Sequence, residues 1–211
     1  MAGMAEFWDR AAREDAEHYV DDRGLRGEEF WRGGEEVVEA FERELDLNVT
    51  GGTVVEVGCG IGRITRALAR RCERVVAVDV SAEMLDRARA ENPGLDNVEW
   101  LHGDGESLAG VGDASADGVF SHVVFQHIPD PAVTLGYVAE MGRVLRPGGW
   151  AAFQVSTDPA VHARADGEDP AWRGSAVDLD ELRARAEAAS LAVEHTFGEG
   201  TQFCLVLLSR R

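Results

Sequence analysis

The sequence lacks long apolar runs. None of its apolar stretches approaches the ~20 residues that a helix needs to span a bilayer. The N-terminus, which contains Glu6, Trp8 and Asp9, also lacks the basic and then apolar pattern of a secretory signal. We therefore expect a cytoplasmic protein that is not embedded in a membrane.

Basic residues are scarce relative to acidic ones. The 211 residues include 21 Lys and Arg against 39 Asp and Glu, which gives a net charge of −18. A nucleic-acid-binding surface needs clustered positive charge to displace counterions, and anionic membrane surfaces attract basic segments. The composition therefore argues against nucleic acids and membranes as partners. With 45% hydrophobic residues, the chain can still bury the core of one globular domain.

Several kinds of chemistry have no sequence pattern to support them. Cys59, Cys72 and Cys204 are odd in number and lie in core-like segments, so we expect reduced thiols. We interpret Cys59 as a small filler within a turn rather than as a nucleophile. The His and Asp residues lack the spacing of metal ligands, so no metal is expected. A Ser-His-Asp hydrolase is not indicated, because the sequence has no Gly-x-Ser-x-Gly elbow.

What the sequence does contain is a glycine-dense turn between an apolar strand and a helix. Residues 54–65 read Val-Val-Glu-Val-Gly-Cys-Gly-Ile-Gly-Arg-Ile-Thr. The alternate glycines Gly58, Gly60 and Gly62 allow a sharp turn and let a ligand lie directly on the backbone. The helix that follows directs its free N–H groups at the same place.

The spacing around this turn indicates which ligand it binds. A dinucleotide fingerprint would have Gly or Ala at position 63, where this chain has Arg63. Glu56, two residues before Gly58, would repel a pyrophosphate but suits an ammonium group. Asp79 ends the next apolar strand about 20 residues after Gly58, where a ribose-binding carboxylate belongs. These features predict a ligand with a ribose, a positive charge and no pyrophosphate.

Four motifs in order then resemble the class I S-adenosylmethionine-dependent methyltransferases, and most of all their small-molecule branch. They are the glycine turn with its acid at residues 56–62, Val78–Ser81, Gly103–Asp104 and Leu145–Gly149. The similarity covers roughly residues 50–156. It implies an α/β fold with a Rossmann-like, doubly wound sheet of seven strands, parallel except for an antiparallel last strand. Helices would cover both faces of that sheet.

The hydrophobic pattern along the chain predicts elements that fit this fold. Helices are expected at 5–20, 28–46 and 62–71, and after the N-caps Ser81, Asp130 and Asp178. Strands are expected at 53–57, 74–78, 97–101, 117–124, 150–156, 191–197 and 202–209. Residues 157–176 are predicted to form a long loop that selects the substrate. We divide the chain into an N-terminal helical lid segment at 1–48 and a methyltransferase domain at 49–211.

The resemblance also implies which residues hold the cofactor. Glu56 and the backbone of residues 58–60 would hold the methionine part, Asp79 both ribose hydroxyls, and Asp104 the adenine amino group. Met84 is either an adenine contact or a core residue. The full predicted set comprises Glu56, Gly58, Cys59, Gly60, Asp79, Val80, Met84, Gly103, Asp104, Gly105, Ser121 and His122.

Other residues are candidates for the substrate side. Trp8, Tyr19 and Trp31 are predicted lid aromatics that could attract a sulfonium, although they could equally anchor their helices. Gln126 and His162 are predicted substrate contacts. His122 and His127 follow the fourth strand and are candidate catalytic bases, because imidazole titrates near neutral pH. The alternative for both is that they only position or pack.

We therefore expect methyl transfer from S-adenosyl-L-methionine to O, N, S or C of a small molecule, which leaves S-adenosyl-L-homocysteine. One alternative is a cyclase or isomerase-like protein that binds the cofactor without transferring methyl. A nicotinamide-dependent oxidoreductase is less favoured, because Arg63 and Glu56 do not suit a dinucleotide. The chain is expected to be a monomer or homodimer. Its Ala, Arg and Gly content is consistent with a bacterial source and with secondary metabolism.

Overall fold

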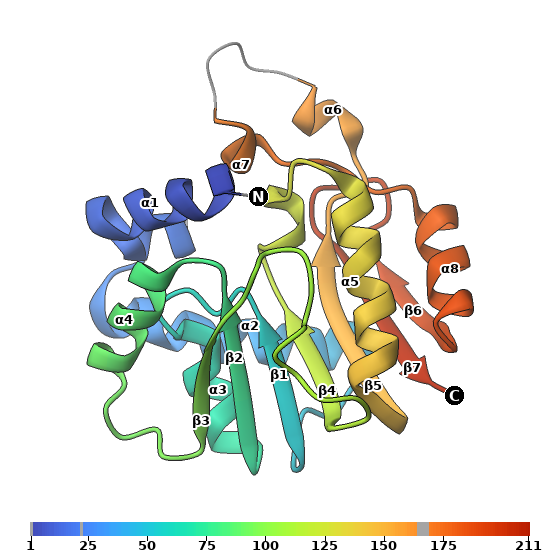
Figure 1. The fold of residues 1–211 in the computed structure, drawn as a ribbon, viewed down its shortest axis with the longest axis horizontal. Coiled ribbons are helices and arrows are strands. Elements are labelled where there is room, and N and C mark those ends of the chain that lie inside the picture. The colour runs from blue at the N-terminus through green and yellow to red at the C-terminus, as the bar shows by residue number, and fades with distance from the viewer. Residues whose placement is uncertain (1, 22, 164–168) are drawn as a thin grey trace. The chain divides into compact units, whose positions relative to one another are not determined.

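The computed structural model describes residues 2–21, 23–163 and 169–211 (Figure 1). Its contacts divide the chain into two compact units, residues 1–105 and residues 106–211. We refer to them as the first and the second unit.

The first unit is built on three parallel strands with long helices around them. Its elements are α1 (Ala2–Val20), α2 (Gly27–Leu45), β1 (Thr53–Val57), α3 (Arg63–Arg71), β2 (Arg74–Asp79), α4 (Ala82–Glu91) and β3 (Val98–His102). β2 pairs in parallel with β1 on one side and with β3 on the other, so that Val76 lies between Val55 and Glu99. The apolar sequences of β1 and β2 explain their burial, because strands covered on both faces need no alternation of polar residues.

The second unit contains the other four strands. Its elements are β4 (Ala116–Ser121), the 3₁₀ turn η1 (Phe125–His127), α5 (Pro131–Val144), β5 (Leu145–Val155), α6 (Pro159–His162), α7 (Pro170–Arg173), α8 (Leu179–Ala188), β6 (Leu191–Phe197) and β7 (Cys204–Arg210). β4 and β5 are parallel, whereas β7 runs antiparallel to both β5 and β6.

The strand order of the sheet is β3-β2-β1-β4-β5-β7-β6. The chain fills one side of β1 with β2 and β3 and then crosses to the other side with β4. One strand, β7, is antiparallel, and it comes last in the chain. The predicted fold class, a Rossmann-like α/β sheet of seven strands with an antiparallel last strand, is therefore confirmed. Helices precede β1, as the sequence indicated.

The predicted helix starts are also confirmed in atomic detail. The Ser81 hydroxyl accepts a hydrogen bond from the Met84 backbone N–H, and Asp130 caps α5 with Pro131 in its first turn. Asp178 accepts from two backbone N–H groups at the start of α8. Such capping side chains satisfy N–H groups that have no partner within the helix.

Three segments of the second unit differ most from those expected. β4 ends at Ser121 rather than at residue 124, because the chain turns at residues 122–124, where Val123 has a positive φ, before η1 begins at Phe125. α5 ends at Val144 and β5 begins at once, since Pro147 disfavours helical backbone just before it. The loop expected at 157–176 contains α6 and α7, although its residues 164–168 lie outside the described part of the chain.

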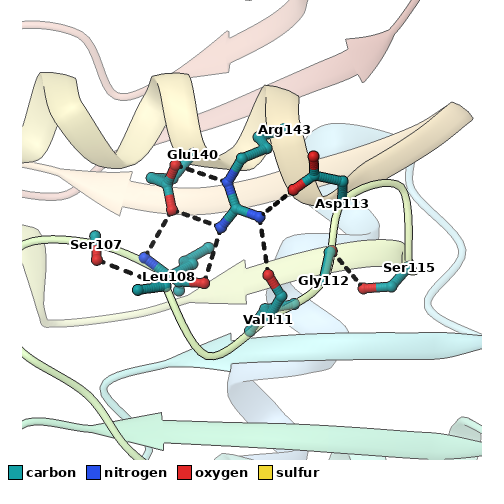
Figure 2. A network of polar contacts seen from close by, with 9 residues as sticks. Ser107, Leu108, Val111, Gly112, Asp113, Ser115, Glu140 and Arg143 are labelled. Atoms are coloured by element: carbon teal, nitrogen blue, oxygen red, sulfur yellow. Dashed lines mark hydrogen bonds and ion pairs between the residues drawn. The ribbon is translucent and has the colours of Figure 1, made fainter.

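One arginine fastens the segment that leads into β4. Arg143 donates to the carbonyl oxygens of Leu108 and Val111 and to the carboxylates of Glu140 and Asp113, as Figure 2 shows. The hydrogen bonds that Arg143 donates to Glu140 and Asp113 raise its pKa above the ordinary value. This network holds the loop before β4 against α5.

Within the described residues, we find no helix that is both long and apolar enough to cross a membrane.

The packing of α5 against α8 gives a testable prediction. A Cβ on Gly142 would lie 2.5 Å from the Ala189 carbonyl oxygen, so Gly142→Ala should destabilise the protein by about 1–3 kcal/mol. Gly136 on the same helix has its nearest such neighbour 4.0 Å away. Gly136→Ala should instead stabilise by about 0.5–1 kcal/mol through helix propensity. Urea unfolding of both variants checks this, and effects of the same sign would contradict it.

Candidate functional site

The carboxyl ends of β1, β2 and β3 meet at the glycine turn. The backbone N–H groups of Gly58 and Cys59 both donate to the Val78 carbonyl, at 2.8 and 3.0 Å. Gly103, just after β3, donates to the Asp79 carbonyl at 2.9 Å. Gly60 has a φ of 53°, in the left-handed region that favours glycine. The three strand ends thus present one continuous backbone surface.

Asp79 is the organising side chain of this surface. It is 9% exposed, and its Oδ2 accepts from the Gly60 N–H at 2.8 Å while its Oδ1 accepts from the Ser81 N–H at 2.9 Å. Burial raises its pKa, and the hydrogen bonds from Ser81 and Gly60 oppose that change. Each carboxylate oxygen has two acceptor positions, so Asp79 keeps acceptor capacity for a ligand hydroxyl.

Glu56 lies deeper, under the glycine turn. It is 2% exposed and accepts from the Thr65 hydroxyl at 2.5 Å. Burial raises the pKa of its carboxyl to about 8, although the Thr65 hydrogen bond and the Arg63 guanidinium oppose the shift. An ammonium group placed beside Glu56 would favour its ionised form.

The thiol at Cys59 does not suit nucleophilic chemistry. It is 3% exposed, and burial beside Asp79 and Glu56 raises its pKa well above the ordinary value. The protonated thiol is a poor nucleophile. This environment agrees with the interpretation of Cys59 as a filler.

The N-terminal helix α1 lies against the same backbone surface. A Cβ on Gly60 would lie 2.8 Å from Val20 Cγ2, and one on Gly105 would lie 2.8 Å from Met4 Cε. Asp9 accepts from the Ser81 hydroxyl at 2.6 Å, which joins the middle of α1 to the start of α4. The predicted lid segment therefore lies against two of the predicted cofactor contacts, Gly60 and Gly105.

The predicted lid aromatics are held by protein neighbours. Trp8 and Trp31 pack, partly buried, against a cluster made of Ala12, Ala16, Phe30, Ile61 and Met84. The Arg66 guanidinium lies 3.6 Å from the centroid of a Trp31 ring, so that face already has a cation. Tyr19 donates a hydrogen bond to Glu14. In this structure Met84 and the tryptophans anchor α1 and α2 in the core of the first unit.

The remaining predicted contacts lie nearby or in the second unit. Val80 and the segment Gly103–Gly105 follow β2 and β3, with Gly105 buried and Asp104 exposed. Ser121 ends β4 and is fully buried, and the half-buried His122 follows it directly.

In the second unit, a buried amide in β5 holds the turn that follows β4. Gln154, in β5, is fully buried; its Oε1 accepts from the Val123 N–H at 2.9 Å, and its Nε2 donates to Gln126 Oε1 at 2.8 Å. Val123 has a φ of 57°, which is strained for a β-branched residue. Gln154 therefore holds both the strained turn and Gln126. The sequence pattern did not single it out.

The hydrogen-bond network assigns the tautomer of His127. Its Nδ1 lies 2.9 Å from the Trp172 carbonyl oxygen, so Nδ1 carries a proton. Its Nε2 lies 3.2 Å from Nε2 of Gln126, which must donate because Gln126 Oε1 accepts from Gln154. Both ring nitrogens of His127 are thus engaged, and the ring is neutral. This arrangement suits a positioning role better than that of a base.

His127 and His162 both fasten α7. His162 Nδ1 lies 2.6 Å from the Arg173 carbonyl oxygen, and the Trp172 ring stacks on His127 with centroids 5.1 Å apart. Gly174 passes so close to η1 that a Cβ on it would lie 1.7 Å from the Gln126 carbonyl oxygen. The segment after residue 169 is therefore seated on η1, beside the predicted substrate contacts. Trp172 is an aromatic that sequence reasoning missed.

Arg63 was also missed as a site residue. It begins α3 directly after the glycine turn and is 3% exposed, and its Nη1 lies 3.3 Å from Asp21 Oδ2. The sequence signal that could have identified Arg63 is a charged residue in the first turn of a helix that is otherwise expected to be buried. Among the described residues, no group of three or more His, Cys, Asp or Glu could hold a metal ion.

The comparison with protein families decides the identity of this site. Residues 55–153, which include the glycine turn, Asp79 and β5, match the family model described as a methyltransferase domain. The chain belongs to the class I S-adenosylmethionine-dependent methyltransferases. Membership of this family implies S-adenosylmethionine as the cofactor.

Relatives of this methyltransferase support the same assignment. It is 44% identical over 105 residues to a trans-aconitate 2-methyltransferase of Azoarcus, a match to 49% of the chain and 38% of that protein. It is 33% identical over 177 residues to a probable S-adenosylmethionine-dependent methyltransferase of Mycolicibacterium smegmatis, a match to 83% of the chain and 64% of that protein. The chain thus spans less than two thirds of these relatives.

A solved structure described as a DhpI–SAH complex is similar over the full length of this chain. The identity is 27%, the TM-score is 0.66, and the match covers 100% of this chain and 98% of the other. This similarity includes the N-terminal helices as well as the sheet.

The buried carboxyl of Glu56 predicts a pH dependence. Its folded pKa of about 8 exceeds the ordinary 4.5, so the folded state binds more protons between these values and stability falls as pH rises from about 5 to about 8. Glu56→Gln should remove this loss, on the order of 4 kcal/mol. Urea unfolding of wild type and variant at pH 5 and pH 8 measures it. Glu39→Gln, an exposed substitution, is the control, and parallel curves for wild type and Glu56→Gln would contradict it.

The amide of Gln154 predicts a second effect. Gln154→Leu keeps the size of the side chain but leaves the Val123 N–H and the Gln126 Oε1 without their partner, which should cost about 2–5 kcal/mol. Exchange of the Val123 amide hydrogen should accelerate in the same variant. Gln202→Leu, which keeps the backbone carbonyl that accepts from Gln154, is the control. Unchanged exchange at Val123 would show that Gln154 does not hold this turn.

Proposed function

We propose that this chain transfers the methyl group of S-adenosylmethionine to a small-molecule acceptor. The observation that carries the proposal is the buried Asp79 carboxylate, fixed by the backbone of Gly60 and Ser81 at the end of β2. A carboxylate fixed in this way can accept hydrogen bonds from ribose hydroxyls without further ordering.

The residues of the first unit fit the other parts of the cofactor. Glu56 offers a negative charge to the ammonium of the methionine part, and the turn at Gly58–Gly60 offers backbone that a side chain would block. Met84 and Asp104 stay proposed adenine contacts, together with Val80 and the glycines beside Asp104. The contacts expected from Ser121 and His122 also stay a prediction. Bound S-adenosylmethionine supplies a methyl group that is activated by the sulfonium. The leaving group is a neutral thioether, so it needs no proton.

The residues of the second unit suggest how an acceptor is held. We assign Gln126, His127 and His162 to positioning, because the two histidines hold α7 and Gln126 is fixed by Gln154. His122 is the remaining candidate base, needed only if the acceptor is an alcohol or phenol. In-line transfer requires the accepting atom about 3 Å from the methyl carbon. Positioning of the acceptor therefore matters more than a strong base.

A small-molecule acceptor is supported by charge and by relatives. The net charge of −18 argues against RNA or DNA as the acceptor. One relative is named for methylation of trans-aconitate, a small molecule. We also propose that residues 1–48 form a lid, since Val20 and Met4 lie against Gly60 and Gly105.

Cofactor titration tests the proposal. Wild type should bind S-adenosylhomocysteine in isothermal titration, and Asp79→Asn should weaken binding about 10-fold or more, because hydrogen bonds to a charged group contribute about 1.5–3 kcal/mol. Asp117→Asn, a change of a half-buried carboxylate that pairs with Arg146 in the second unit, should leave the affinity unchanged. Binding of a nicotinamide cofactor instead would support the oxidoreductase. The alternative is a protein that binds the cofactor without transferring methyl. It would be supported if the chain binds the cofactor but forms no S-adenosylhomocysteine when small carboxylates, amines and phenols are offered.

A further inference from the structure

A hollow in the second unit lies where the ends of α5 and α8 meet the end of β7. The two helices pack against each other (Figure 1), and the hollow has a volume of about 360 Å³, which is in the range of small-molecule sites. Small residues such as Gly142 and Ala189 leave this space open. Arginines complete its wall, namely Arg143, Arg185 and Arg210.

This hollow is separate from the predicted acceptor contacts of the second unit. It lies where α5 ends at Val144 and β5 begins at Leu145. Gln126 and His127 instead follow β4, which runs parallel to β5, so they lie beyond the opposite edge of the sheet. A ligand in the hollow would therefore bind away from the acceptor side of this unit.

The three arginines of the hollow differ in how their charges are balanced. Arg143 is paired with Glu140 at 2.7 Å and with Asp113 at 2.6 Å. Arg210 donates from Nη1 to the Ala189 carbonyl oxygen at 2.7 Å, but its Nε is buried without a hydrogen-bond partner. Arg185 is exposed and makes no polar contact within the described part of the chain. Two guanidinium groups of one hollow thus have no carboxylate among the described residues.

Such an excess of positive charge is unusual in this chain. Its acidic residues outnumber its basic ones by 39 to 21, yet the eight residues that line the hollow include three arginines and no Asp or Glu. The carbonyl end of a helix attracts cations, which accounts for the bond between Arg210 and Ala189. It does not account for Arg185, which forms no such bond. The charges of the wall therefore favour an anion.

We propose that this hollow binds a phosphate group, held by Arg185 and Arg210 with the Ser190 hydroxyl as a further donor. A phosphate monoester carries about −1.5 to −2 charges near neutral pH and offers three acceptor oxygens, so it balances two guanidinium groups better than a single carboxylate does. Guanidinium groups bind phosphate through paired N–H groups. The inference goes beyond the proposed function and does not require S-adenosylmethionine.

Two probes separate the possible sources of the phosphate. Isothermal titration at constant ionic strength compares inorganic phosphate with glycerol 3-phosphate, and glycerol is the uncharged control. Saturable binding of either phosphate supports the site. Tighter binding of glycerol 3-phosphate assigns the hollow to a phosphorylated small molecule, whereas equal affinity assigns it to the free anion. The absence of saturable binding by both at millimolar concentration would overturn the proposal.

Variants with the same change of charge test the position of the site. Arg185→Gln and Arg210→Gln should each weaken phosphate binding about 10-fold, because each removes a charged donor. Arg183→Gln is the matched control, since Arg183 lies on the same helix but pairs with Asp180 and Glu199. It should leave the affinity unchanged. An equal loss in Arg183→Gln and Arg185→Gln would mean that only the general field of the surface attracts phosphate, and the site would be overturned.

Two further measurements keep the test decisive. The backbone amide signal of Ser190 should shift as phosphate binds, and an unchanged signal would place the anion elsewhere. S-adenosylhomocysteine should not compete with glycerol 3-phosphate, because competition would place the phosphate on the cofactor surface. If Arg210→Gln does not fold, Arg185→Gln still carries the test, since Arg185 makes no polar contact that the fold could lose.

Discussion

The contact between Asp79 and two backbone N–H groups is the constraint on which the first unit depends. It joins the glycine turn after β1 to the start of the segment after β2 through a single buried carboxylate. A Gly60 in the left-handed region brings its N–H to that carboxylate, and Ser81 then caps α4. Strand ends, helix start and ligand surface are therefore fixed together, so a change at Asp79 disturbs all three.

The site keeps two ionisable side chains whose burial reduces the stability of the fold. Burial holds the Glu56 pKa near 8, and Arg63 lies buried with two nitrogens unbonded by the described residues. A well-packed apolar core would avoid both costs. The second unit shows a similar compromise at Val123, where one amide holds strained backbone.

His127 illustrates how tertiary contacts can favour one of two roles that the sequence left open. Imidazole chemistry made His127 a plausible base, but Gln126 and the Trp172 carbonyl engage its two nitrogens. The imidazole then serves as a connector that seats α7 on η1. Trp172, which stacks on it, becomes the aromatic most closely linked to the predicted substrate contacts, in place of the lid tryptophans.

The sequence by itself determined the fold class, the glycine turn after the first strand, the place of Asp79 at the end of the second strand and the helix caps. Each of these depends on spacing within a few residues and on backbone geometry. Only the tertiary structure decided which charges are buried and what they contact. The buried Arg63 guanidinium lies beside the Asp21 carboxylate, and the Gln154 amide bonds to that of Gln126, 28 residues away. Such pairings leave no periodic trace in the chain, since they arise where folded elements meet rather than within any one of them.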